Sequence, residues 1–213
     1  MSTESRQAHW EKVYTSKGEN EVSWFQENPA PSLDLIARAG ATTASAVIDV
    51  GGGASRLIDA LIEKGIRAVT VLDLSQAALA TAKARVGRRA DQVHWIVADV
   101  TTWEPHAAAY DVWHDRAAFH FLVDQGDRAG YIARLSKAVK PGGYAIIGTF
   151  APDGPERCSG LPVARYDAQG LHRELGDAFE LVETFRNEHR TPSGSVQHFQ
   201  FSLFRRAFTR TGA

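Results

Sequence analysis

The stretch Asp49–Ser55, which reads Asp-Val-Gly-Gly-Gly-Ala-Ser, constrains the fold of this 213-residue chain more than any other feature. An apolar, β-branched run at 46–50 predicts a buried strand, and apolar residues recur at helical spacing over 54–64. Glycines between a strand and a helix let the backbone approach a ligand where a Cβ would clash. A second apolar run ends in Asp73, whose carboxylate is placed to accept both ribose hydroxyls of an adenosine. This segment therefore predicts an α/β fold that binds an adenosine-containing ligand.

The rest of the chain continues the alternation of strand and helix signals. Expected strands are 46–50, 68–73, 93–98, 110–115, 143–150, 179–189 and 196–206, and expected helices are 5–16, 31–39, 54–64, 75–86, 125–138 and 167–175. This order predicts a Rossmann-like, doubly wound, mostly parallel seven-stranded sheet with helices on both faces. The turn-rich segment 190–194 predicts that the last two strands close the sheet as an antiparallel hairpin. We expect an N-terminal helical cap at 1–39 and the main domain at 40–213, within one globular unit.

Composition excludes several classes of protein. Hydrophobic residues make up 44% and charged residues 23% of the chain, as in ordinary soluble globular domains. A net charge of -1 gives no general attraction to nucleic acid or to an anionic membrane. The single cysteine excludes an internal disulfide, and neither a signal peptide nor a membrane-length apolar run is seen. We therefore expect a cytoplasmic protein, with Arg85, Arg88 and Arg89 forming a solvated helix end.

The glycine pattern decides which adenosine ligand is expected. A dinucleotide fold requires Gly-x-Gly-x-x-Gly, but after Gly51 and Gly53 the third position is Arg56. Asp49 would repel a pyrophosphate and attract a cationic amino acid. Asp-x-Gly-x-Gly followed by Asp73 resembles the class I, seven-β-strand S-adenosylmethionine-dependent methyltransferases, over roughly residues 40–206. The resemblance implies S-adenosylmethionine as the cofactor, bound through Asp49, Gly51, Gly53, Asp73 and Leu74.

Further cofactor contacts are expected after the third strand and near the N-terminus. In this family an acidic residue after the third strand binds the adenine amino group, which implies Asp99, with Val100 or Trp103 packing on the ring. The alternative is that Asp99 caps the turn at Thr101. The N-terminal segment carries a cluster of aromatic residues, namely Trp10, Tyr14 and Trp24. Their rings either cover the cofactor's sulfonium cation as a lid or dock the N-terminal helix onto the core.

The end of the strand 110–115 is the expected position of the methyl acceptor, because open α/β sheets bind ligands beyond the carboxyl ends of their strands. We expect Asp115, Arg116 and His120 to face the acceptor there. This corner resembles thiopurine S-methyltransferases in Trp113, Asp115, Arg116, Asp127, Arg128 and Tyr131. The N-terminal His9, Trp10 and Tyr14 are similar in part to small protein-lysine methyltransferases. The candidate substrate-binding residues are Phe119, Cys158 and Arg190.

Other chemistries lack their motifs. The corner does not contain the Asn-Pro-Pro-Tyr sequence of enzymes that methylate nucleobase amino groups, nor the acid-acid-amide set that holds Mg²⁺ in catechol-type O-methyltransferases. A zinc site built from His114, His120 and Cys158 lacks any recognised ligand spacing. We therefore expect neither a metal nor a nucleic-acid partner.

The function that the residues favour is in-line SN2 transfer of a methyl group to a small-molecule acceptor, with a soft nucleophile such as a thiol preferred. A thiolate needs no strong base, whereas a hydroxyl would need one, for which His120 is the candidate. The alternatives are a protein-lysine N-methyltransferase and a non-catalytic module that binds an adenosine ligand. A NAD-dependent oxidoreductase is disfavoured by Arg56. The sequence gives no indication of an oligomeric state.

Overall fold

The structure is a computed structural model that describes residues 3–208. Its helices are α1 (Thr3–Ser16), α2 (Ala30–Arg38), α3 (Leu57–Glu63), α4 (Gln76–Val86), α5 (Gln125–Ala138) and α6 (Ala168–Leu175), with the short 3₁₀ helices η1 (Gly87–Gln92) and η2 (Phe119–Phe121). Its strands are β1 (Ala46–Val50), β2 (Ala68–Asp73), β3 (Val93–Val97), β4 (Tyr110–Arg116), β5 (Val139–Phe150), β6 (Arg157–Cys158), β7 (Leu161–Pro162), β8 (Phe179–Arg190) and β9 (Val196–Arg206).

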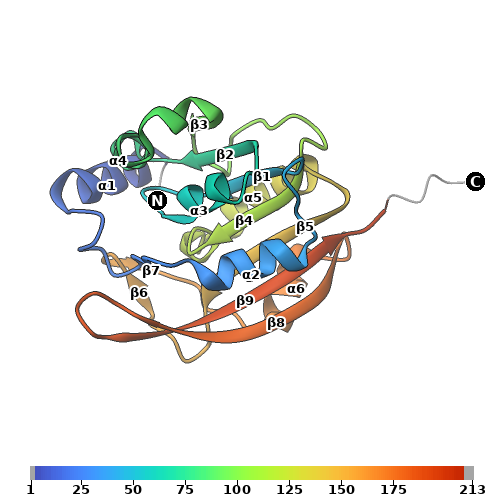
Figure 1. The fold of residues 1–213 in the computed structure, drawn as a ribbon. Coiled ribbons are helices and arrows are strands. Elements are labelled where there is room, and N and C mark those ends of the chain that lie inside the picture. Colours follow the sequence, from blue (N-terminus) through green and yellow to red (C-terminus); the bar gives the residue numbers. More distant parts are fainter. Residues whose placement is uncertain (1–2, 209–213) are drawn as a thin grey trace, which may run out of the picture.

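The central sheet has the strand order β3-β2-β1-β4-β5-β9-β8 (Figure 1). Strands β1 to β5 run parallel to one another, whereas β9 is antiparallel to β5 and β8 is antiparallel to β9. This arrangement confirms the predicted doubly wound sheet and its closing hairpin. The strand order switches direction between β1 and β4, which is where open α/β sheets bind ligands. The segment after β5 contains an additional two-stranded sheet, formed by β6 and β7.

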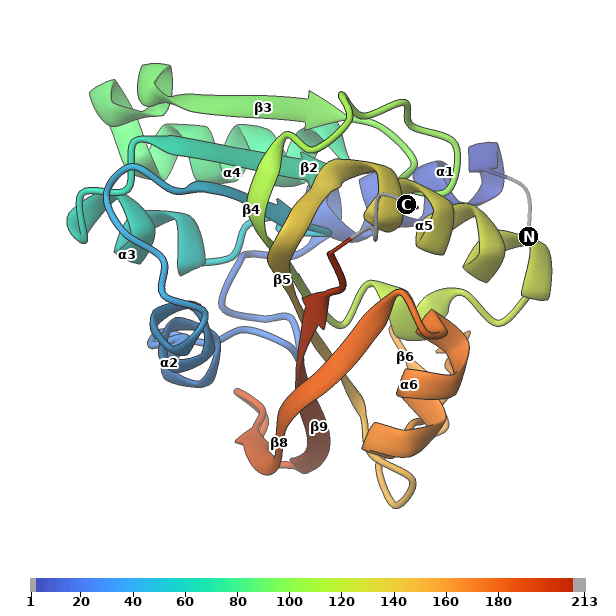
Figure 2. The ribbon, with the colours of Figure 1, turned by 90° about the vertical axis from the view of Figure 1, so that its right-hand side faces the viewer.

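Successive residues along each strand face opposite layers of helices. Val47 of β1 belongs to a buried cluster with Leu57 and Leu61 of α3, whereas Ile48 belongs to a second cluster with Leu135 of α5. Helices α2, α3 and α4 therefore cover one face of the sheet, and α5 and α6 cover the other (Figure 2). Because both faces are buried, the central strands are short, continuous apolar runs.

Two element boundaries differ from the sequence prediction by three residues or more. α3 begins at Leu57 rather than at 54, because the glycine turn continues to Arg56 and the Oγ of Ser55 accepts the N–H of Leu57 at 3.1 Å. β5 begins at Val139 rather than at 143, because Val139 pairs with Tyr110 before a bulge in the β4–β5 ladder. Both differences come from hydrogen bonds that local residue preferences do not reveal.

The N-terminal segment is held against the sheet by polar contacts. The carboxylate of Glu11 in α1 accepts the Oγ–H of Ser75 at 2.8 Å and the N–H of Ala77 at 3.2 Å, at the beginning of α4. Leu35 and Ile36 of α2 are buried in the same cluster as α3. Helix α2 thus contributes to the core, and the boundary at residues 39 and 40 stays a prediction.

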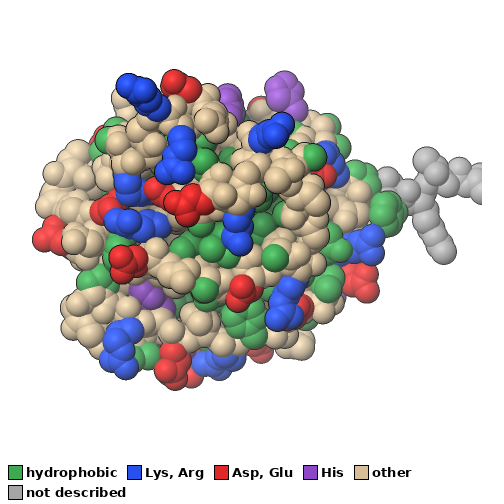
Figure 3. All heavy atoms as spheres, in the orientation of Figure 1, with side chains coloured by type: hydrophobic (Ala, Val, Ile, Leu, Met, Phe, Trp, Pro, Cys, Tyr) green, Lys and Arg blue, Asp and Glu red, His purple; other side chains and the backbone are tan. Residues whose placement is uncertain are grey.

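The surface carries both signs of charge. On the face in Figure 3, the acidic and basic side chains are interspersed rather than gathered by sign. Among residues 3–208, none of the helices combines the length and the apolar composition needed to cross a bilayer.

Candidate functional site

A cavity opens at the carboxyl ends of the central strands. Its wall includes many of the residues that the sequence predicted for the cofactor and the acceptor: Trp10, Tyr14, Trp24, Gly51, Asp73, Leu74, Asp99, Val100, Arg116 and Cys158. These residues come from α1, from the segment before α2, from the ends of β1, β2, β3 and β4, and from β6. The fold thus brings together side chains that lie far apart in the sequence.

Two positions in the turn after β1 require glycine, both because their φ angles are positive and because a side chain would clash with neighbouring atoms. Gly51 and Gly53 adopt φ values of +66° and +48°, which side chains disfavour. A Cβ on Gly51 would lie 2.6 Å from the Cβ of Ala118, and a Cβ on Gly53 would lie 2.7 Å from the hydroxyl of Tyr14. The turn therefore passes close to both walls of the cavity.

Asp73 lies at the end of β2 with 8% of its surface exposed. Burial raises the pKa of its carboxyl to about 6, although hydrogen bonds from the N–H groups of Ser75, Gly53 and Leu74 oppose the shift. Its Oδ1 accepts the N–H of Ser75 at 2.8 Å. Asp73 is thus an ionised acceptor at neutral pH, which is the chemistry that a ribose diol requires.

Asp99, at the end of β3, forms a buried ion pair that the sequence analysis did not include. Its Oδ2 lies 2.7 Å from Nη2 of Arg6, and Arg6 also pairs with Asp127 of α5. Its Oδ1 accepts the N–H and the Oγ–H of Thr101 at 2.8 and 2.7 Å. Asp99 therefore caps the turn at Thr101, as the alternative interpretation held, and also faces the cavity, so its contact with adenine stays a prediction. Arg6 lies one helical turn before Trp10 in α1. This spacing was the sequence signal that could have placed Arg6 on the same helix face as Trp10, toward the cavity.

The aromatic residues of the N-terminal segment pack against one another at the mouth of the cavity. The ring centroid of Trp10 lies 5.6 Å from that of Trp24 and 4.9 Å from that of Phe121, both edge to face. Nε1 of Trp24 donates to the hydroxyl of Tyr14 at 3.1 Å. The cluster both docks α1 and lines the cavity, so the two interpretations of these rings are compatible.

A second cavity adjoins the first at Gly51 and is lined in part by Asp49, His114, Ser32 and Arg116. Asp49 and His114 are cross-strand neighbours on β1 and β4, and their Oδ1 and Nδ1 atoms lie 2.7 Å apart. Nε2 of His114 lies 2.8 Å from the Oγ of Ser32 in α2. A buried chain of hydrogen bonds through His114 and Ser32 therefore fixes the side chain of Asp49. This contact depends on the register between β1 and β4, which the sequence does not show.

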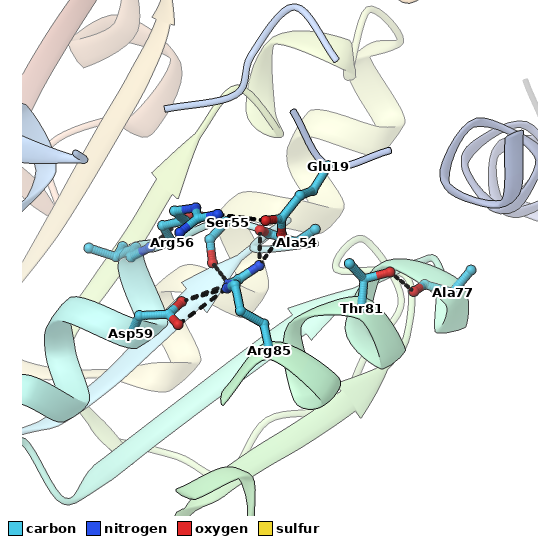
Figure 4. Close-up of polar contacts among 9 residues, drawn as sticks. Glu19, Ala54, Ser55, Arg56, Asp59, Ala77, Thr81 and Arg85 are labelled. Atoms are coloured by element: carbon cyan, nitrogen blue, oxygen red, sulfur yellow. Dashed lines mark hydrogen bonds and ion pairs between the residues drawn. The ribbon is translucent and has the colours of Figure 1, made fainter. Parts of the chain in front are cut away.

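An ion-pair network fastens the segment before α2 to the end of the glycine turn (Figure 4). Glu19 accepts Nη2 of Arg56 at 2.7 Å and also pairs with Arg85 of α4. Arg85 also pairs with Asp59 at 2.7 Å and donates to the carbonyl oxygen of Ala54 at 2.9 Å. The prediction of a solvated helix end was therefore wrong for Arg85, whose side chain is 16% exposed and holds two parts of the chain together.

Asp115 is placed in the core. Its side chain is completely buried, and its carboxylate accepts the N–H of Ala118 at 2.9 Å, the N–H of Phe119 at 3.0 Å and the hydroxyl of Tyr131 at 2.8 Å. Burial raises its pKa to about 6. Tyr131 in turn accepts Nε1 of Trp113 at 2.8 Å. Asp115 thus shapes the turn that follows β4, and its expected contact with the acceptor stays a prediction.

The other residues predicted for the acceptor lie in different environments. Phe119 is completely buried, with its ring centroid 4.8 Å from that of Tyr131. Arg190 ends β8 with an exposed side chain and donates to the carbonyl oxygen of Gly194 at 3.2 Å. In the described part of the chain, the residues that line the two cavities include Arg116 and Cys158 but not Phe119, His120 or Arg190.

His120 is completely buried in η2, where its Nδ1 accepts the N–H of Phe150 at 3.4 Å. Burial, together with the nearby positive charge of Arg116, lowers its pKa to about 3. The imidazole is therefore neutral at physiological pH. Burial also raises the pKa of the Cys158 thiol, to about 11. Among residues 3–208, no group of three or more His, Cys, Asp or Glu side chains is arranged to hold a metal ion.

Comparison with known proteins indicates a methyltransferase domain within the chain. Residues 47–143 match the model of a methyltransferase domain. The chain is 30% identical over 156 residues to a trans-aconitate 2-methyltransferase of Paracidovorax citrulli, covering 71% of this chain and 56% of that protein. It is 31% identical over 122 residues to a trans-aconitate 2-methyltransferase of Variovorax paradoxus, covering 57% of this chain and 44% of that protein. The chain thus spans about half the length of these curated relatives.

Solved structures agree on the fold. A Burkholderia thailandensis 1,6-didemethyltoxoflavin-N1-methyltransferase, solved with 1,6-didemethyltoxoflavin and S-adenosylhomocysteine, superposes with a TM-score of 0.72 at 21% identity, covering 97% of this chain and 91% of that one. A structure reported for the conversion of a disulfide bond into a thioacetal group during echinomycin biosynthesis superposes with a TM-score of 0.77 at 21% identity, covering 96% of this chain and 94% of that one.

Residues 47–143 match a methyltransferase domain, and the chain has the fold of the class I S-adenosylmethionine-dependent methyltransferases. The predicted family and its cofactor, S-adenosylmethionine, are thereby confirmed. The residues present fit this cofactor, since an ionised Asp73 and a glycine turn without side chains adjoin one cavity. The resemblances to thiopurine and protein-lysine methyltransferases stay predictions.

Proposed function

We propose that this protein transfers a methyl group from S-adenosylmethionine to a small-molecule acceptor. The observation that carries the proposal is the cavity at the ends of β1, β2 and β4, where Asp73 and the glycine turn adjoin Arg116 and Cys158. The methyltransferase names of the curated relatives support it. When bound, S-adenosylmethionine supplies an electrophilic methyl group on a sulfonium ion.

Each part of the cofactor has a complementary residue in the proposed site. Asp73 would accept the ribose hydroxyls, and Asp99 would accept the adenine amino group beside its ion pair with Arg6. Asp49 would provide negative charge for the methionine ammonium while Oδ1 keeps its contact with His114. Leu74 and Val100 would pack on the adenosine, and the aromatic rings of Trp10, Tyr14 and Trp24 would cover the sulfonium, whose positive charge is attracted to ring faces.

The protonation states around the cavity favour an acceptor that needs no base. His120 is neutral but completely buried, and its low pKa makes it a weak base. The Cys158 thiol stays protonated at neutral pH, and Asp49 is engaged by His114. A nucleophile that is already anionic or soft, such as a thiolate, avoids this difficulty. Its charge would also cancel that of the sulfonium during in-line transfer, which a water-poor site favours. A thiol is therefore our first choice of acceptor group.

A carboxylate is the second candidate for the methylated group. The curated relatives are named trans-aconitate 2-methyltransferases, and trans-aconitate is a tricarboxylic acid. A carboxylate is anionic at neutral pH and, like a thiolate, would need no base.

The test is to incubate the purified protein with methyl-labelled S-adenosylmethionine in a lysate of the host organism and to separate macromolecules from small molecules. We expect label in the small-molecule fraction, and we expect the Asp73→Ala variant to lose it. Label in a discrete protein band would favour the protein-lysine alternative. Confirmed cofactor binding without label in either fraction would favour the non-catalytic alternative.

A further inference from the structure

Arg116, the last residue of β4, has an unusual set of hydrogen bonds. Its Nη1 donates to the carbonyl oxygen of Trp24 at 2.8 Å, and its guanidinium lies 4.7 Å from the ring centroid of Phe199 in β9. These two contacts fix the plane of the guanidinium. Its Nε and Nη2 are buried, yet within residues 3–208 neither has a hydrogen-bond partner. One edge of the guanidinium is therefore held in place with its donors unused.

The buried and partly buried arginines Arg6 and Arg85 differ from Arg116 because each has acidic partners. Arg6 pairs with two acidic side chains, Asp99 and Asp127, and Arg85 pairs with Glu19 and Asp59. The ion pairs among the described residues do not include Arg116. Burial lowers its pKa to about 10, so it still carries a positive charge at neutral pH. Asp49 and Cys158 oppose the shift through space, but neither forms a hydrogen bond with Nε or Nη2 of Arg116. A buried charge without a hydrogen-bonded partner is costly, and a bound anion would offset that cost.

The unused edge has the shape that recognises a carboxylate. Nε and Nη2 lie on the same side of a planar guanidinium, where their N–H bonds are parallel and match the two oxygens of a carboxylate. Arg116 also borders both cavities, so an anion can reach it from the site already described. The packing partner Phe199 belongs to β9, on the opposite side of β4 from Asp73 and Asp99. Arg116 thus packs against the side of the sheet away from the strands that carry Asp73 and Asp99.

We propose that the Nε–Nη2 edge of Arg116 binds a carboxylate of the methyl acceptor, an inference that rests on the proposed function. A carboxylate with both oxygens in hydrogen bonds is a poor nucleophile, so this group anchors the acceptor and a different atom receives the methyl group. The acceptor class is thus a small organic acid that carries a second nucleophile, either a thiol or another carboxylate. Arg116 determines specificity and takes no proton in the reaction.

Titration calorimetry on the protein saturated with S-adenosylhomocysteine tests the proposal by measuring the affinity for acceptor analogues. S-adenosylhomocysteine has no methyl group to transfer, so no reaction occurs during the titration. The probes are two pairs that differ in charge: 3-mercaptopropionate against 3-mercaptopropionamide, and trans-aconitate against its trimethyl ester. For at least one pair we expect the acid to bind about tenfold or more tightly than its neutral analogue, a difference of about 1.4 kcal/mol. In Arg116→Gln the preference should fall to about threefold or less. Arg116→Lys, which keeps the charge but loses the fork, should lie between the two.

The control is Arg38→Gln, which removes an exposed arginine of α2 and should leave the preference unchanged. Circular dichroism establishes that each variant is folded, and Arg116→Lys still tests the proposal if Arg116→Gln does not fold. Failure of both acids to bind the wild type, or an unchanged acid preference in Arg116→Gln and Arg116→Lys, would overturn the proposal.

The carboxylate could instead be that of the cofactor's methionine part, and a second titration separates the two sources. If Arg116→Gln weakens S-adenosylhomocysteine but not 5′-methylthioadenosine, which lacks the amino-acid group, the assignment to the acceptor is overturned. A different result would contradict the proposed function without contradicting the role of Arg116. If the acids bind through Arg116 but no methyl group is transferred to any acceptor, the binding role stands and the enzymatic role falls.

Discussion

The ion pair between Arg6 and Asp99 gives a sharp test of how α1 is docked. Nη2 of Arg6 lies 2.7 Å from Oδ2 of Asp99, and the side chains are 9% and 4% exposed. Replacing Arg6 with Met removes the charge and keeps most of the apolar stem. Removing one partner of a buried ion pair costs about 3–5 kcal/mol, since the other charge stays buried. Asp99 borders a cavity and keeps its bonds from Thr101, so we expect the lower end, about 3 kcal/mol.

For a chain of this size each kcal/mol lowers Tm by about 2–4 °C, so Arg6→Met should lower Tm by about 6–12 °C. Differential scanning calorimetry at neutral pH measures this. Arg38→Met is a matched control, because Arg38 pairs with Glu183 at 2.6 Å but its side chain is 60% exposed. A surface pair contributes about 0–1 kcal/mol, so the control should lose at most about 4 °C. Equal shifts in the two variants would refute the argument that burial makes the Arg6 pair strong.

Three further predictions concern the cavity and its surroundings. Gly53→Ala should weaken S-adenosylmethionine binding about tenfold by forcing Tyr14 away, whereas Gly176→Ala, with positive φ but open space, should cost about 1 kcal/mol of stability and leave binding unchanged. Cofactor affinity should fall as the pH drops through about 6, where Asp73 takes up a proton, and Asp73→Asn should flatten that profile in calorimetric titrations. His120 has a folded pKa near 3, below its unfolded value, so its neutral form stabilises the fold above about pH 6.5 and this contribution is lost on acidification. The stability advantage of wild type over His120→Gln in urea titrations should therefore shrink by up to about 1.4 kcal/mol per pH unit between pH 6 and 4; a constant difference would place His120 in water.

The fold was predictable because its signals are local. The first three strands are short apolar runs with an acidic residue at or near the carboxyl end, namely Asp49, Asp73 and Asp99, and buried parallel strands look like this in sequence. The closing hairpin was predictable from the turn-rich segment between two long strands. Many residues that border the cavity containing Asp73 and Asp99 follow from the same logic, since parallel strands end at one edge of the sheet.

The contacts that the sequence did not reveal join residues that are distant along the chain. Glu19 meets Arg85, and Arg6 meets Asp99, only because α1 and the segment before α2 fold back over the sheet. The pairing of Asp49 with His114 depends on the register between β1 and β4. Asp115 shows a different difficulty. An acidic residue at the end of a strand resembles a catalytic group, although here its carboxylate accepts backbone N–H groups of the turn that follows.

Titration of the purified protein with S-adenosylmethionine at neutral pH is the most direct test of the central claim that this cavity is the cofactor site of a methyltransferase. We expect saturable binding of one cofactor per chain, weakened at least about tenfold in Asp73→Ala, which loses a charge-assisted acceptor worth about 1.4 kcal/mol. Arg38→Gln should bind like the wild type. Absence of binding, or equal affinity in wild type and Asp73→Ala, would contradict the account.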